Sequence, residues 1–474
     1  MSSRRSYLLA LAGVLAGCST GERESPPTSD RTTRLSETPT PTTRRPTARS
    51  TPQETPEPTD TPRPLPDEEI DVQRRTARHP RLRWSMQLSE PVQHPPAHDP
   101  RTGRVYVGAG PPSFAPVGSD DPDPFGGVVA FESTDGTVAW RSVTRAPVAN
   151  PPFVHDGRVH LTTASNSYRD RPRVVAFDQG GTRQWERTDL FTPHFVAGRD
   201  GTVFAGDSTD APRSSGRTLY ALAPDGSIEW ESEAGDAMGA QLVDGRLLYR
   251  AGVQAMAAYD PATGDRHWQR EGRGLRAPNE PPLVAGGHCF VTPPELDDEG
   301  AIIARSVATG AEQWRYDPPW TDNFVPTAVA ALPTPADADY SIVCTEYGGT
   351  VFALDDTGSE RWRFGMEATN NAGPIVGESV YVTDDTATLY ALDPADGSER
   401  WRQSVPDLAA PIATADGPLV FESSEERSVL LSYGSDGAER WRFESDRFLH
   451  EPIVTGNRAY ATARDGSVFA FDLS

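Results

Sequence analysis

The sequence contains no lysine, so all 45 of its basic residues are arginines, against 68 aspartates and glutamates. The imbalance is confined to one part of the chain: residues 1–80 carry 12 arginines and 11 acidic residues, whereas the remainder carries 33 and 57. A surface this acidic repels nucleic acid, whose binding requires a positive patch. Such a composition is typical of halophilic archaea, where salt screens the repulsion between carboxylates. An acidic patch for a cationic partner is the alternative.

Cysteine is scarce, with three residues in 474. Cys289 and Cys344 are far apart, and each lies in an apolar segment typical of a strand. We expect both to be buried free thiols. No C-x-x-C pair and no Cys/His spacing indicates a metal site.

The apolar run at the N-terminus, Tyr7 to Ala16, is too short to span a bilayer. It follows Arg4-Arg5 and ends in the tetrad Leu15 to Cys18, which resembles a lipobox. We interpret residues 1–18 as a twin-arginine lipoprotein signal and Cys18 as the lipidated residue. The sequence therefore predicts an extracytoplasmic protein that the N-terminal lipid anchors to the cell membrane. The alternative is an ordinary cleaved signal with an accidental cysteine.

Residues 19–80 contain almost no large apolar side chains and are rich in Thr, Pro, Ser and Arg. Such a segment cannot bury enough surface to offset the entropy of ordering. We predict a disordered tether, whose threonines are candidates for O-linked sugars.

The remaining segment, 81–474, repeats one pattern, clearest from Thr388 to Arg402. Alternating apolar residues predict a strand, Asp396-Gly397 predicts a tight turn, and Trp401 follows on the returning strand. From Trp140 onward, copies recur every 38–48 residues, which is the length of a four-stranded propeller blade. The repeat tryptophans are Trp84, Trp140, Trp185, Trp230, Trp268, Trp314, Trp362, Trp401 and Trp441.

Trp84 has no repeat strand before it, and the last repeat strand, which begins at Val468, has no tryptophan after it. We predict that the two halves pair and close a ring, which removes the open edges of a linear stack. The predicted fold is an all-β propeller of four-stranded antiparallel blades. The repeat count gives nine blades, and eight remains an alternative because propellers usually have about four to eight.

The pattern Ala391, Asp393, Gly397 and Trp401 resembles the repeat of pyrroloquinoline-quinone-type (quinoprotein-like) β-propellers. That family includes quinone-dependent dehydrogenases and the lipoprotein propeller of bacterial outer-membrane assembly. The resemblance implies that each tryptophan packs between blades and donates its indole N–H to the backbone. A ligand-stacking platform is the alternative. We expect the repeat aspartates to close their own turns.

Long insertions interrupt several repeats. Four of them join a second strand to a third, and therefore lie on one face of the ring: Pro111 to Phe125, Ser165 to Pro172, Ser208 to Gly216 and Pro293 to Gly300. A fifth, Pro333 to Asp339, joins a first strand to a second on the opposite face. Because loops carry function in such folds, we expect the face with four insertions to be the working one. The alternative is that surface loops simply tolerate insertion.

Catalytic signals are lacking. The resemblance implies that a quinone-dependent alcohol dehydrogenase would use adjacent cysteines and a calcium ion, yet the chain has no adjacent cysteines and no lysine for the quinone. Candidate calcium ligands are Asp120, Asp121 and Asp123, or Asp297, Asp298 and Glu299. His94 and His98 flank Pro95-Pro96, which forbids a helix that would align them. No hydrolase, zincin or phosphate-loop motif is present.

We therefore predict no catalytic residue, no metal site and no cofactor, with pyrroloquinoline quinone and Ca²⁺ as the alternative. The predicted function is a binding or scaffolding module for a protein or glycan partner. A quinoprotein oxidoreductase is the alternative function.

Overall fold

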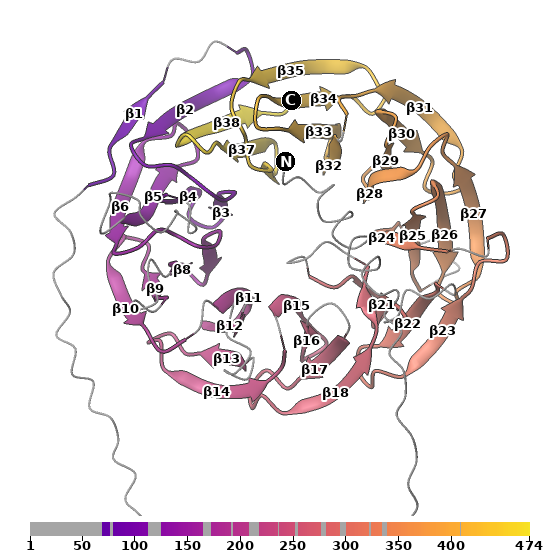
Figure 1. Ribbon diagram of the computed structural model, residues 1–474, viewed down its shortest axis with the longest axis horizontal. Coiled ribbons are helices and arrows are strands. Elements are labelled where there is room, and N and C mark those ends of the chain that lie inside the picture. The colour runs from indigo at the N-terminus through magenta and orange to yellow at the C-terminus, as the bar shows by residue number, and fades with distance from the viewer. Residues whose placement is uncertain are drawn as a thin grey trace, which may run out of the picture. The chain divides into compact units, whose positions relative to one another are not determined.

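The computed structural model describes residues 69–75, 79–111, 125–164, 172–190, 193–207, 218–235, 237–251, 255–275, 281–293, 300–321, 324–333, 339–407 and 409–474. These residues form nine antiparallel sheets, each a blade whose strands follow one another from the centre outward (Figure 1). The all-β fold and the count of nine blades are confirmed, and the alternative of eight blades is wrong. No helix in this part of the chain has the length and apolar character needed to cross a membrane.

We number the blades in chain order. Blade 1 comprises β3 (Ala97–Asp99), β4 (Arg104–Ala109), β5 (Gly126–Glu132) and β6 (Val138–Thr144), and blade 2 comprises β7 (Phe153–His155), β8 (Arg158–Thr162), β9 (Val174–Phe177) and β10 (Arg183–Arg187). Blade 3 comprises β11 (Pro193–Arg199), β12 (Thr202–Asp207), β13 (Thr218–Leu222) and β14 (Ile228–Glu233), and blade 4 comprises β15 (Ala237–Val243), β16 (Arg246–Ala251), β17 (Ala255–Tyr259) and β18 (Arg266–Glu271).

Blades 5 and 6 are β19 (Arg273–Gly274) with β20 (Val284–Ala285), β21 (His288–Thr292), β22 (Ile302–Ser306), β23 (Glu312–Tyr316); and β24 (Pro326–Leu332), β25 (Ser341–Glu346), β26 (Thr350–Asp355), β27 (Glu360–Gly365). Blades 7 and 8 are β28 (Asn370–Val376), β29 (Val380–Asp384), β30 (Thr388–Leu392), β31 (Glu399–Ser404); and β32 (Ala410–Thr414), β33 (Gly417–Ser423), β34 (Ser428–Tyr433), β35 (Glu439–Ser445). The ninth, which we call the closing blade, comprises β36 (Ile453–Thr455), β37 (Arg458–Thr462), β38 (Ser467–Asp472), β2 (Leu82–Leu88) and β1 (Val72–Arg74).

The hydrophobic core lies between blades. Strand β26 shows how the sequence achieves this, because its side chains alternate between two interfaces. Phe352 and Leu354 pack in the cluster shared with blade 5, whereas Val351 and Ala353 pack in the cluster shared with blade 7. A strand buried on both faces reads as a continuous apolar run, and this is the repeat that the sequence shows.

The ring closes where the sequence predicted. Strand β2 pairs antiparallel with β38, with Trp84 opposite Ala470 and Met86 opposite Val468. The closing blade therefore takes its outer strand from the start of the ordered region and its three inner strands from the end. No hairpin turn joins β38 to β2, because the two strands are far apart in the sequence. His79 lies at this point instead, with its ring 5.8 Å from that of Trp441 and its Nε2 2.8 Å from the Arg442 carbonyl oxygen.

Strand β1 was not predicted and corrects one boundary. Residues 69–75, which we call the strap, fall in the range assigned to the tether, yet Val72 pairs with Leu88 and Arg74 with Met86 on the outer edge of β2. Ile70 is fully buried between the closing blade and blade 1. Its side chain fills a slot over Gly127, where an added Cβ would lie 2.8 Å from Ile70 Cδ1. The signal segment with Cys18, and residues 19–68 of the predicted tether, lie outside the described residues.

Candidate functional site

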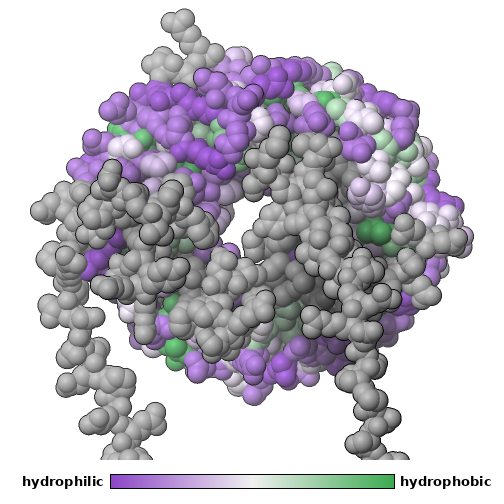
Figure 2. All heavy atoms as spheres, in the orientation of Figure 1, coloured by the Kyte–Doolittle hydropathy of each residue, from purple (hydrophilic) through white to green (hydrophobic). Residues whose placement is uncertain are grey.

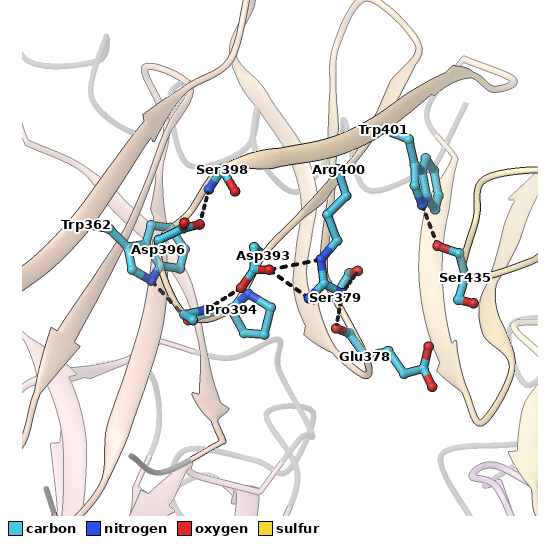
Figure 3. Close-up of polar contacts among 11 residues, drawn as sticks. Trp362, Glu378, Ser379, Asp393, Pro394, Asp396, Ser398, Arg400, Trp401 and Ser435 are labelled. Carbon is cyan, nitrogen blue, oxygen red and sulfur yellow. Dashed lines mark hydrogen bonds and ion pairs between the residues drawn. The ribbon is translucent and has the colours of Figure 1, made fainter. Parts of the chain in front are cut away.

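Each repeat tryptophan lies on the fourth strand of its blade, counted from the centre, and Figure 3 shows the arrangement at two of them. Trp362 of blade 6 packs against Gly397, in the turn between the third and fourth strands of blade 7, where φ is 72°. A Cβ added to Gly397 would lie 2.4 Å from Trp362 Cε3. Trp362 Nε1 also donates a 3.1 Å hydrogen bond to the Pro394 carbonyl of that turn. The indole thus joins consecutive blades.

The same contact recurs at eight interfaces. The other pairs are Trp84–Gly136, Trp140–Gly181, Trp185–Gly226, Trp230–Gly264, Trp268–Gly310, Trp314–Gly358 and Trp401–Gly437. Six indole N–H groups donate to a carbonyl of the next blade, those of Trp84, Trp185, Trp230, Trp268, Trp362 and Trp401. The indole N–H of Trp314 donates instead to the hydroxyl of Tyr340. The indole N–H groups of Trp140 and Trp441 have no hydrogen-bond partner among the described residues. This geometry favours the packing role over the ligand-stacking platform.

The repeat aspartates close their own turns. Asp393 accepts a 2.8 Å hydrogen bond from the Ala395 N–H through Oδ1 and pairs with Arg400 through Oδ2 (Figure 3). Asp355 accepts 2.9 Å bonds from the N–H groups of Thr357 and Ser359. These bonds lower the pKa of both aspartates, although partial burial opposes the shift at Asp355. These carboxylates accept hydrogen bonds that hold the backbone of their own turns.

We name the two faces of the ring by their connections. The turn face carries the first-to-second and third-to-fourth turns, and the insertion face carries the second-to-third connections. The strand bounds show that residues 110–125, 163–173, 208–217 and 293–301 all join second strands to third strands, in blades 1, 2, 3 and 5. In blades 6 and 7 the equivalent connections are only residues 347–349 and 385–387. Most residues of the four insertions, including all six candidate calcium ligands, lie outside the described residues.

The two histidines flanking Pro95-Pro96 point to different neighbours. Burial lowers the pKa of His94 to about 4, with His450 and His194 adding to the shift. His98, on β3, stacks instead on Tyr460 of the closing blade at 5.5 Å and 16° between the rings. No pattern in the sequence indicates the contact between His98 and Tyr460, because the two residues belong to distant repeats.

Cys289 on β21 and Cys344 on β25 are buried free thiols in different interblade clusters. Burial raises the pKa of Cys289 to about 12 and also raises that of Cys344. Thiols held protonated in this way are poor nucleophiles. Among the described residues, no group of three or more His, Cys, Asp or Glu side chains is arranged to hold a metal ion.

The model of the family described as outer membrane protein assembly factor BamB matches residues 71–316, 215–348, 347–429 and 385–474. BamB of Shewanella oneidensis is 23% identical over 313 residues, which are 62% of this chain and 78% of that protein. BamB of Yersinia pestis is 25% identical over 309 residues, 60% of this chain and 75% of that protein. The crystal structure of BamB from Moraxella catarrhalis covers 68% of this chain and 95% of its own at 16% identity, with a TM-score of 0.47.

The family matches together run from residue 71 to residue 474, which includes every blade and most of the strap. The resemblance of the repeat to quinoprotein-like propellers, and to the outer-membrane assembly member in particular, is therefore confirmed. The chain belongs to the family of outer membrane protein assembly factor BamB.

Proposed function

We propose that this protein is a membrane-tethered, extracytoplasmic propeller that binds other proteins as a scaffold. The observation that carries the proposal is the family match over residues 71–474, because the family and the relatives from Shewanella oneidensis and Yersinia pestis are named as assembly factors. The chemistry of the described residues agrees with it. The repeat tryptophans and aspartates are engaged in holding the blades, and both described thiols are buried.

The insertion face is the proposed binding surface. Four blades carry long second-to-third connections there, and blades 1 to 3 carry them side by side. The described third-to-fourth turns of the opposite face are short, and most of them are closed by an aspartate, as at Asp225 and Asp260. Extra chain length is therefore concentrated on one face, and loops held by a rigid scaffold are where binding residues gather.

The proposed anchor is a lipid on Cys18, after removal of the twin-arginine signal. Because the strap begins at residue 69, the proposed tether between anchor and ring is residues 19–68. In a polyproline-like conformation, at about 3 Å per residue, such a segment spans many nanometres. This length would let the ring reach partners well beyond the membrane surface.

The quinoprotein alternative finds little support in the described residues. Cys289 and Cys344 lie in different blades, and the sequence offers neither adjacent cysteines nor a lysine. Addition of pyrroloquinoline quinone with Ca²⁺ to the pure protein, followed by absorbance and dye reduction, tests this alternative directly. We expect no cofactor spectrum and no dye reduction.

The proposal is tested by exchanging loops. In two variants, residues 112–124 or 208–217 are replaced by the short connection of blade 7, residues 385–387. The matched control shortens residues 334–338, which lie between β24 and β25 on the turn face. Full-length proteins are cross-linked in envelope fractions, and captured material is identified after protease or glycosidase treatment.

We expect the wild type and the control to retain the same protein partner and the insertion-face variants to lose it, with all melting temperatures within a few degrees. A partner that survives protease and is lost to glycosidase would instead assign a glycan ligand. Capture that is equal in all variants would contradict the assignment of the binding face.

A further inference from the structure

A cavity of about 260 Å³ opens on the turn face between the closing blade and blade 1. Its walls come from both ends of the ordered chain. Blade 1 contributes His98, Pro100, Gly103 and Ser133, and the closing blade contributes Thr455, Asn457, Arg458 and Tyr460. We call this cavity the seam pocket. Its volume lies below the range usual for drug-sized ligands, which favours a small molecule.

The inner wall of the seam pocket is the stacked pair of His98 and Tyr460. Neither side chain makes a hydrogen bond to another described residue, so the His98 nitrogens and the Tyr460 hydroxyl are available to a ligand. Burial lowers the pKa of His98, Arg458 adds to the effect, and Asp99 opposes it. The neutral imidazole offers one donor and one acceptor. The Asp99 carboxylate itself is engaged within its own turn, where it accepts bonds from Arg101 and Thr102.

Arg458 carries the only charge among the side chains that line the pocket, because His98 is neutral. Arg458 Nη1 donates a 3.0 Å hydrogen bond to the Ser133 carbonyl, and Arg458 Nε lies 3.7 Å from Asp472 Oδ1. The same carboxylate lies 3.3 Å from Arg83 Nη1, so two guanidinium groups share one acidic side chain. Arg458 Nη2 makes no hydrogen bond to another described residue. In a chain of net charge −23, such a site is a distinctive place for an anion.

We propose that the seam pocket binds a small monocarboxylate with a hydroxylated body, of the uronic acid class. The carboxylate would pair with Arg458 Nη2, as arginine favours. The hydroxyl groups would bond to His98, Tyr460 and Thr455. Because the two walls belong to opposite ends of the ordered chain, the bound ligand also fastens the closure of the ring.

Calorimetry on the full-length protein tests the binding, with glucuronate as ligand and glucose as the uncharged control, at constant sodium concentration. A charge-assisted hydrogen bond is worth about 1.5–3 kcal/mol, which corresponds to at least about tenfold in affinity. We therefore expect glucose and Arg458→Gln each to weaken binding about tenfold or more. The matched control is Arg246→Gln, because Arg246 begins β16 of blade 4 as Arg458 begins β37. It should bind glucuronate as the wild type does.

A second variant guards against a folding defect in Arg458→Gln. His98→Phe keeps an aromatic ring against Tyr460 but removes both nitrogens, so it should fold and bind more weakly. Hydrogen exchange provides the readout of closure: glucuronate should slow the exchange of amides in β2 and β38 and leave those of blades 3 to 6 unchanged. Equal affinity for glucose, an equal loss in Arg246→Gln, or protection spread evenly over the ring would each overturn the proposal. The outcome is independent of partner capture, because the pocket and the insertions lie on opposite faces.

Discussion

Substitution of Gly397 by alanine should be unusually destabilising, because two separate constraints meet at this glycine. Its φ of 72° is a left-handed conformation that costs a residue with a Cβ about 1–2 kcal/mol. The new Cβ would also lie 2.4 Å from Trp362 Cε3, so the indole must move. Overpacking of this kind adds about 1–3 kcal/mol, and displacement of the indole strains its bond to Pro394. We expect a total loss of about 2–5 kcal/mol in the free energy of unfolding.

Gly245→Ala isolates the first constraint. Gly245 has a φ of 71°, and a Cβ there would meet nothing within 4 Å, so the expected loss is only about 1–2 kcal/mol. Both variants are measured by urea denaturation followed by tryptophan fluorescence. Repeating Gly397→Ala in a Trp362→Phe background completes a double-mutant cycle, and the smaller ring should reduce the additional loss. If the two glycines cost the same, or if the smaller ring changes nothing, the account of the indole–glycine contact is wrong.

Two further predictions concern buried side chains. Burial lowers the pKa of His160 to about 3. Below pH 6.5 this histidine is therefore protonated in the unfolded chain but stays neutral in the folded protein, which destabilises the folded state. Between pH 7 and pH 5 the wild type should lose about 2 kcal/mol more unfolding free energy than His160→Phe, and parallel pH profiles would contradict this. Ile70→Ala should cost about 2 kcal/mol or more, because it empties a fully buried site. The exposed Val138→Ala is the control, and an equal effect on the melting temperature would show that the strap contributes nothing.

The architecture was predictable because the same local pattern occurs many times in the sequence. The strand, turn and tryptophan around Trp401 recur at blade spacing, and the lone Trp84 already implied a ring closed between distant segments. The strap was not predictable in the same way. It occurs once, in a polar context, and its burial depends on a slot over Gly127 in blade 1, which is distant from the strap in sequence.

The candidate binding surfaces were predictable only in part. The connectivity of the insertions follows from their position between strands, so the sequence could assign them to one face. The stacking of His98 on Tyr460 could not be foreseen, because these residues belong to different repeats and meet only through closure. The spacing of the repeats predicts which strands pair, but it does not predict which side chains face one another between the closing blade and blade 1.

The interface between blade 8 and the closing blade differs from the other eight for a physical reason. Elsewhere a tryptophan meets a turn glycine of the next blade, but no turn joins β38 to β2, and among the described residues no glycine faces Trp441. The His79 ring occupies that place. On the other side of the closing blade, the strap adds contacts to blade 1, because Arg141 donates to the Ile70 carbonyl and Arg74 donates to the Asp135 carbonyl. Because β2 is held to β38 without a connecting turn, ring closure carries a loop-closure cost that the other interfaces avoid. The added contacts lie on both sides of the closing blade, where they offset that cost, and the ligand proposed for the seam pocket would add to them.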